Sequence, residues 1–276
     1  MNKRKFSTAP LPFMGQKRRF VADFRTALKT FDQATVFVDL FGGSGLLAHT
    51  AKQERPDARV IFNDFDNYTR RLENADQTNR LISDIREIVA DAAKDKMLPP
   101  LVKEAVLQRV YTEEQRGFVD YITLSSSLLF SMNYTTNYDQ FSKATIYNRV
   151  RKESYCCEGY LAGVEREQCD YRALFNRYRN VKGVVFFIDP PYLSTEVSVY
   201  ENYWRLSDYL DVLHTLKGTS YFYFTSNKSS IVELLEWAER NLGATNPFAG
   251  ATKKEICSRP NYHASHTDIM LYKQAG

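Results

Sequence analysis

Four consecutive residues, Asp189-Pro190-Pro191-Tyr192, combine a carboxylate, two prolines and an aromatic ring. They directly follow the apolar run 184–188, which is short and rich in β-branched and aromatic residues and therefore predicts a buried strand. The prolines end this strand because neither has an N–H group to donate. Open α/β sheets bind ligands at the carboxyl ends of their strands. A carboxylate and a proline carbonyl there suit an amino group on a flat heterocycle; a plain Pro-Pro turn with Tyr192 packed at its rim is the alternative.

A glycine-rich turn, residues 42–45, is the second chemical signal. It follows the apolar run 36–41 and precedes a helical pattern that starts at 46–48. Glycines let the backbone bend sharply and approach a ligand closely. Asp64 ends the next predicted strand, about twenty residues further on, where a carboxylate can hold ribose hydroxyls. Residues 43–48 also fit the dinucleotide-binding pattern G-x-G-x-x-G/A, so a NAD-dependent enzyme is a second interpretation.

Taken together, these motifs resemble the D12 class of DNA adenine-N6 methyltransferases. The order of glycine turn, long insertion and Asp-Pro-Pro-Tyr motif is that of the alpha group of these enzymes. Their N-terminal motif usually ends in two glycines and a lysine, whereas this chain has Gly15, Gln16 and Lys17. The segments that carry the resemblance are 12–17, 39–45, 63–64, 170–171 and 189–192.

The expected fold class is α/β: a Rossmann-like, S-adenosylmethionine-dependent methyltransferase core with an inserted, mainly helical target-recognition domain. Residues 1–96 and 164–276 are expected to form the discontinuous catalytic core. The adjacent prolines Pro99 and Pro100 interrupt the helical pattern, and hydrophobic periodicity is lost beyond Asn133. These two features place the expected insertion at residues 97–163. Helices are predicted at about 20–29, 68–94, 101–110, 115–132, 171–179, 206–216 and 231–241. Strands are predicted at 36–41, 60–64, 184–188 and 221–225, with a closing hairpin of 255–257 and 268–272.

The resemblance implies site-specific methyl transfer from S-adenosylmethionine to the N6 amino group of adenine in double-stranded DNA. Adenine N6 is a poor nucleophile, and Asp189 and the carbonyl of Pro190 can each accept a hydrogen bond from one of its two N–H groups. The candidate catalytic residues are Asp189, Pro190, Pro191 and Tyr192, with Tyr192 stacked on a base that has left the helix. Cytosine N4, RNA adenine and protein glutamine are alternative planar amines, but an Asp at position 189 favours adenine.

The resemblance also implies a set of cofactor contacts. Asp64 would hold the cofactor ribose, and Asp170 its adenine amino group. Asp39 and the glycine turn would hold its methionine end. For Asp170 the alternative is a helix N-cap before Tyr171. The full set of candidate cofactor residues is Phe13, Lys17, Asp39, Phe41, Gly42, Gly43, Ser44, Gly45, Asp64, Asp170, Tyr171 and, at its edge, Asp189.

The segment 133–155 is the candidate DNA contact because it is polar, aromatic and basic without a clean period. Lysine and arginine neutralise phosphates, whereas asparagine or arginine can read base edges. A solvated loop is the alternative interpretation. The candidate DNA-binding residues are Asn133, Tyr138, Lys143, Asn148, Arg149, Arg151 and Lys152.

Composition bounds the remaining classes of protein. The 276 residues carry a net charge of +4, which allows a nucleic-acid partner without demanding one. The four cysteines and four histidines show no metal-binding spacing, so no metal is expected. No apolar run approaches a membrane span, and no signal core follows the basic N-terminus, so a cytoplasmic location is expected. Double-stranded DNA is the expected partner, a cognate restriction endonuclease is a second candidate, and we expect a monomer.

Overall fold

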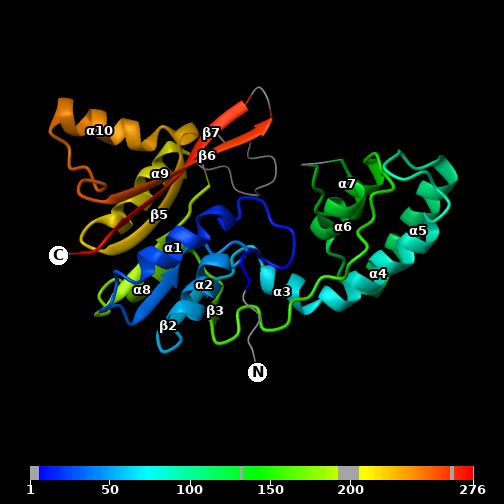
Figure 1. The fold of residues 1–276 in the computed structure, drawn as a ribbon, viewed down its shortest axis with the longest axis horizontal. Coiled ribbons are helices and arrows are strands. Elements are labelled where there is room, and N and C mark those ends of the chain that lie inside the picture. The colour runs from blue at the N-terminus through cyan, green and yellow to red at the C-terminus, as the bar shows by residue number, and fades with distance from the viewer. Residues whose placement is uncertain (1–5, 131–132, 192–204, 262–263, 276) are drawn as a thin grey trace. The chain divides into compact units, whose positions relative to one another are not determined.

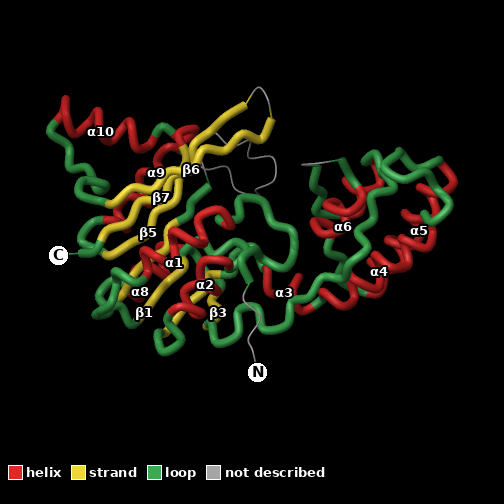
Figure 2. The backbone as a smooth tube through the Cα atoms, viewed as in Figure 1, coloured by secondary structure: helices red, strands yellow, loops and turns green. Residues whose placement is uncertain are grey.

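The computed structural model describes residues 6–130, 133–191, 205–261 and 264–275. The chain forms two compact units. The sheet unit comprises Met1–Thr8, Gln16–Asp66 and Leu161–Gly276, and the helical unit comprises Ala9–Gly15 and Asn67–Tyr160. In Figure 2 the strands belong to the first unit, whereas the second is built from helices and loops. Within the described residues, no helix is both long and apolar enough to span a membrane.

The sheet unit contains a seven-stranded sheet in the order β3-β2-β1-β4-β5-β7-β6 (Figure 1). The first five strands of that order pair in parallel, and β7 pairs antiparallel with both β5 and β6. The strands are β1 Val36–Asp39, β2 Arg59–Asn63, β3 Glu165–Glu167, β4 Val184–Ile188, β5 Ser220–Ser226, β6 Thr252–Asn261 and β7 Ala264–Lys273. The predicted parallel strands and the closing hairpin are confirmed, and the arrangement is that of a Rossmann-like methyltransferase fold.

The central strands of the sheet are buried along their whole length, and their sequences are nearly continuous apolar runs. Such runs are typical of strands that are covered on both faces. On one face Phe24 of α1 (Val21–Leu28) packs edge-on against Phe187 and Phe222, with ring centroids 5.1 and 4.8 Å away. On the other face Phe175 of α8 (Tyr171–Tyr178) packs against Phe186 in the main hydrophobic cluster. The remaining helices of this unit are η1 Arg18–Phe20, α2 Leu46–Glu54, α9 Leu206–Leu213, η3 His214–Leu216, η4 Asn227–Ser229 and α10 Ile231–Leu242.

The strand order reverses between β1 and β4. The chain leaves β1 through α2 towards β2, whereas it leaves β4 through α9 towards β5, on the other side. The register pairs Asp39 with Phe187, so the carboxyl ends of β1 and β4 lie side by side. Helices on either side of such a reversal diverge, which opens the crevice where doubly wound sheets bind ligands.

The helical unit consists of α3 Tyr68–Glu73, α4 Ala75–Ile88, α5 Pro100–Arg116, α6 Tyr121–Leu128 and α7 Tyr138–Lys143. The single helix predicted at 68–94 is wrong, because the chain breaks at Asn74 and the second helix ends at Ile88. The predicted boundary at 110–115 is also wrong. There α5 continues to Gly117, whose φ of +151° ends it, and α6 starts only after Asp120, whose carboxylate caps the N–H of Thr123.

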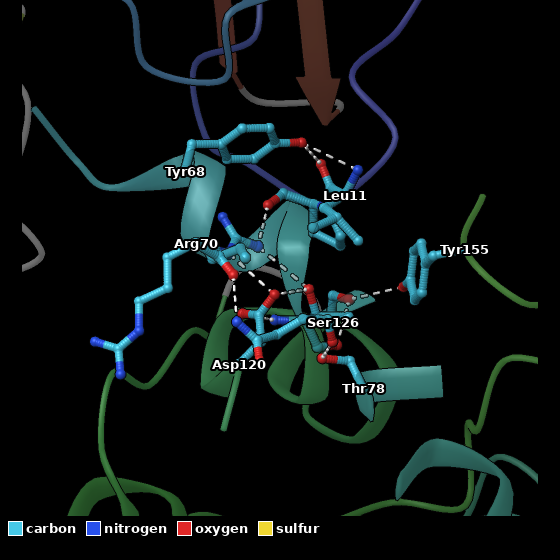
Figure 3. A network of polar contacts seen from close by, with 11 residues as sticks. Leu11, Tyr68, Arg70, Thr78, Asp120, Ser126 and Tyr155 are labelled. Atoms are coloured by element: carbon cyan, nitrogen blue, oxygen red, sulfur yellow. Dashed lines mark hydrogen bonds and ion pairs between the residues drawn. The ribbon is translucent and has the colours of Figure 1, made fainter. Parts of the chain in front are cut away.

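A buried polar network holds the helical unit together (Figure 3). The hydroxyl of Tyr68 donates to the carbonyl of Leu11 and accepts from its N–H, both at 3.1 Å. Arg71 forms a buried ion pair with Asp120 at 3.0 Å and donates to the carbonyl of Pro12. These contacts attach residues 9–15 to α3, and through Arg71 they join α3 to the start of α6, although the three segments are far apart in the sequence.

The compact units do not divide the chain at the predicted residues 97 and 163. The longer segment of the helical unit begins earlier, at Asn67, and ends at Tyr160, and Ala9–Gly15 belongs to the same unit. The physical reason is that α4 bonds to α5: Arg109 pairs with Asp84 at 2.8 Å, and Gln77 donates to Glu113. A role in target recognition for this part of the chain stays a prediction.

Candidate functional site at the carboxyl ends of the parallel strands

Two carboxylates and one ammonium group meet where the strand order reverses. Asp39 is the last residue of β1 and Asp189 follows β4. Phe37 stacks on Phe187 with ring centroids 5.7 Å apart, so Asp39 and Asp189, each two residues further on, share that face of the sheet. Lys17 lies 2.6 Å from Asp189 Oδ2, and its side chain is only 11% exposed. The sequence motifs at 17, 39 and 189 are therefore brought together.

The two carboxylates differ in their partners. Asp39 is 1% exposed; the backbone N–H groups of Phe41 and Ala48 face its carboxylate and lower its pKa, but neither oxygen makes a hydrogen bond of normal geometry with the described residues. Burial, together with the negative charge of Asp189, raises the pKa of Asp39 to about 8. Burial also raises the pKa of Asp189, but there the charge and hydrogen bond of Lys17 oppose the increase. Lys17 thus favours an ionised Asp189, the form that accepts hydrogen bonds.

The glycine turn follows β1 without a break. Gly43 and Gly45 have φ of +53° and +72°, a left-handed region that disfavours other residues. A Cβ on Gly42 would overlap the ring of Phe62, and one on Gly45 would lie 2.8 Å from Leu161. The turn thus needs glycine for close packing as well as for its backbone angles. Ser44 is buried, and Phe41 packs its ring on Tyr171 at 4.9 Å.

A second cluster forms where β2 ends. Asp64 is fully buried and its Oδ2 accepts from Nε of Arg166 at 2.8 Å. Asn63 donates to the carbonyls of Leu40 and Cys169 and accepts from the N–H of Cys169. Asn63, at the end of β2, thereby connects the residue after β1 with the segment after β3. Sequence reasoning did not predict this role. Phe65, next to Asp64, is 58% exposed, and an exposed ring at this edge was also missed.

Asp170 caps α8, as the alternative interpretation predicted. Its carboxylate accepts from the N–H of Arg172 at 2.8 Å, and its side chain is 57% exposed. The other carboxylate oxygen lies 3.7 Å from the guanidinium of Arg172, and a contact of Asp170 with a cofactor stays a prediction. Tyr171 is buried beneath Phe41.

The N-terminal motif is divided between the two units. Phe13 belongs to the helical unit, where its ring meets Tyr68 at 5.7 Å, whereas Lys17 belongs to the sheet unit. Gly15 has a φ of +78°, but Gln16 is not among the residues with positive φ. The backbone therefore does not require glycine at position 16. Pro190 is buried and Pro191 half-buried, while Tyr192 lies outside the described residues.

The predicted DNA-binding residues all belong to the helical unit. Lys143 and Lys152 are exposed, and Lys143 pairs with Asp139 at 2.7 Å. Asn148 is different: its amide nitrogen donates to the carbonyls of Val89 and Ala92. That geometry argues against direct base reading by Asn148 and for a role in holding the end of α4.

The other predicted DNA contacts have partners of their own. Tyr138 donates to the carbonyl of Leu107, Arg151 lies over Tyr155 at 4.3 Å, and Arg149 lies 3.7 Å from Asp95. Asn133 is exposed. A search of the described residues finds no group of three or more His, Cys, Asp or Glu that could hold a metal ion.

Comparison with known proteins agrees with this geometry. A family model described as D12 class N6 adenine-specific DNA methyltransferase matches residues 13–219, which span the sheet edge and the helical unit. A protein of Haemophilus influenzae named "Putative methyltransferase" is 36% identical over 285 residues, covering 99% of this chain and 94% of its own. This family match replaces the NAD-dependent interpretation of the glycine turn. The chain therefore belongs to the D12 class of N6 adenine-specific DNA methyltransferases.

Proposed function

We propose that this protein transfers a methyl group from S-adenosylmethionine to adenine N6 at a specific site in double-stranded DNA. The observation that carries the proposal is the position of Asp189, held by Lys17 at 2.6 Å, at the reversal point of the strand order. Ligands of doubly wound sheets bind at that point. The acceptor for the target amine thus lies beside the glycine turn that would hold the methyl donor.

The chemistry requires acceptors for both N–H bonds of the amine. An ionised Asp189 can accept a hydrogen bond from one N–H group and the carbonyl of Pro190 from the other, which frees the nitrogen lone pair. As the new N–C bond forms, the methyl–sulfur bond of the donor would break and leave a neutral thioether. The amine would then lose one proton to Asp189, which already accepts its hydrogen bond. Lys17 would hold Asp189 in place and oppose the rise that burial causes in its pKa. Once the reactants are held in this way, the reaction is effectively unimolecular.

The residues present also fit the methyl donor. S-adenosylmethionine supplies an already activated methyl group on a sulfonium, so no metal is needed. Asp39 offers a buried carboxylate that only the backbone N–H groups of Phe41 and Ala48 face at less than ideal geometry, and a cationic ligand would stabilise its charged form. Asp64 would hold the ribose, oriented by Arg166. Phe65 offers an exposed ring next to Asp64, suited to stacking on the adenine of the donor.

The helical unit would recognise the DNA. Its exposed lysines and arginines at 143, 149, 151 and 152 can neutralise phosphates. The target base must be extruded from the duplex to reach Asp189, and Tyr192 is the predicted stacking partner. The paired endonuclease, the monomeric state and the cytoplasmic location stay predictions.

The experiment is to map methylated bases in the genome of a host strain that lacks its own adenine methylation. Cells expressing the protein should acquire N6-methyladenine in one short sequence motif, whereas cells expressing Asp189→Ala should not. The variant should still bind S-adenosylmethionine in calorimetry, because Asp189 contacts the target amine. Methylation at cytosine, or methylation that persists in the variant, would contradict the proposal.

A further inference from the structure

Lys17, which lies beside the proposed catalytic carboxylate, is the first of three consecutive cations and is followed by Arg18 and Arg19. Lys17 forms an ion pair with Asp189. Arg18 and Arg19 follow it in the 3-10 turn η1 and are both exposed. No carboxylate among the described residues lies within 4.0 Å of the Arg18 guanidinium. The proposed mechanism uses neither arginine.

The turn that carries the two arginines is fixed at both ends. The carbonyl of Lys17 accepts from the N–H of Phe20 at 2.9 Å. Phe20 is 2% exposed, and its ring packs on Phe224 of β5 at 5.8 Å. The helix α1 continues directly from this turn into the aromatic core. Arg18 and Arg19 are therefore presented from a rigid base, which limits the entropy lost when they bind a ligand.

The charge of the chain is unevenly distributed between the units. Residues 67–160 contain thirteen Lys or Arg and thirteen Asp or Glu, so their net charge is zero. The excess of four positive charges in the whole chain therefore belongs to the other segments. Neutralised phosphates provide much of the affinity of proteins for DNA. The helical unit carries exposed lysines and arginines but no net positive charge, so cations of the sheet unit are candidates for further phosphate contacts.

We infer that Arg18 and Arg19 contact backbone phosphates of the DNA strand that carries the target adenine. This assignment rests on the proposed function. If the amino group of a nucleotide lies at Asp189, the distance from its phosphates to Lys17 is about the length of one nucleotide. Arg18 and Arg19 directly follow Lys17 in the chain. Guanidinium groups bind phosphate oxygens through paired N–H donors. Recognition of the site would then belong to the helical unit, while these arginines position the target strand.

The test uses the full-length protein and a duplex containing the motif mapped in the host genome. Arg18→Gln, Arg19→Gln and the double variant are compared with Arg179→Gln. Arg179 is an exposed arginine just before β4, at the opposite end of the strand that leads to Asp189. Equilibrium binding is measured across a salt series. The slope of log affinity against log salt should fall by about 0.9 for each lost phosphate contact and stay unchanged in Arg179→Gln.

A second measurement locates the contact. Duplexes with a neutral methylphosphonate on either side of the target adenine should bind the wild type more weakly, but the double variant should show no further loss at the contacted phosphate. Affinity for S-adenosylmethionine should be unchanged. Equal slopes in all variants, a slope that falls equally in Arg179→Gln, or loss of cofactor binding would overturn this assignment alone. A wild type that neither binds nor methylates the duplex would overturn the proposed function, and this assignment with it.

Discussion

The ammonium group of Lys17 lies 2.6 Å from Oδ2 of Asp189, and both side chains are largely shielded from water. One residue comes from the N-terminal motif and the other follows β4, so the fold brings together two motifs of the family match that are far apart in the sequence. A shielded carboxylate without a partner would tend to keep its proton. The charge and hydrogen bond of Lys17 oppose the rise that burial causes in the pKa of Asp189, and so favour the form that accepts hydrogen bonds.

The first prediction follows from this pair. Lys17→Met removes the charge and hydrogen bond that lower the pKa of Asp189, so that pKa should rise further. At a given pH less Asp189 is then ionised, and the acidic limb of the activity profile should move to higher pH. The maximal rate should fall by about 10²-fold, the usual cost of losing one preorganised electrostatic contact. Single-turnover methylation rates from about pH 5 to 9 provide the measurement.

Lys17→Arg is the matched control because it keeps the positive charge. Its acidic limb should stay close to that of the wild type, even if its rate is lower. An unshifted profile in Lys17→Met would show that Lys17 does not control the ionisation of Asp189.

The second prediction concerns the stability of the free protein. The pKa of Asp39 is raised from 3.8 to about 8, so the folded protein keeps a proton that the unfolded chain loses. Stability should therefore fall as pH rises from about 4 to 8, by up to about 1.4 kcal/mol per unit. Asp39→Asn should remove this fall and be more stable than the wild type at neutral pH.

Urea unfolding followed by tryptophan fluorescence can measure this effect in the sheet unit, which contains both tryptophans of the chain. The exposed Asp57 provides the control substitution, Asp57→Asn, which should leave the pH slope as in the wild type. If the slope for Asp39→Asn equals that of the wild type, Asp39 is ionised in the folded protein across this range.

The sequence predicted the chemical residues that follow directly on buried strands. Asp39, Asp64 and Asp189 each end an apolar run, and the sheet brings such ends to one edge. The side chains from other segments that bond to these residues could not be predicted from the sequence. The bonds from Arg166 to Asp64 and from Asn63 to Leu40 depend on strand order and register, which hydrophobic periodicity does not encode.

The boundaries of the helical unit were less predictable for a related reason. Periodicity alone carries α4 through to residue 94 and starts α6 at 115. The actual ends depend on single residues, such as Gly117 and the capping carboxylate of Asp120. The packing of α4 on α5 depends on contacts such as the ion pair of Arg109 with Asp84. A local sequence pattern does not reveal such a contact.

The third prediction tests the ring that sequence reasoning missed. Phe65→Ala should weaken binding of S-adenosylmethionine by about 1–3 kcal/mol, the usual contribution of a base stacked on an aromatic side chain. Phe65→Tyr should retain most of the affinity. Phe130→Ala is the control because Phe130 is a similarly exposed ring, 60% accessible, in the helical unit. Titration calorimetry measures all three, and an unchanged affinity in Phe65→Ala would remove the stacking assignment.

The last prediction separates structure from recognition in the segment 133–155. Asn148→Ala leaves the carbonyls of Val89 and Ala92 without their side-chain donor, so the turn after α4 should lose about 1–3 kcal/mol of local stability. Hydrogen exchange of the amides near residues 89–95 should accelerate, while the methylated motif stays the same. Lys152→Ala should instead leave exchange unchanged and flatten the salt dependence of DNA binding by about one unit, because Lys152 is exposed. A changed motif with normal exchange in Asn148→Ala would restore this asparagine as a base-reading residue.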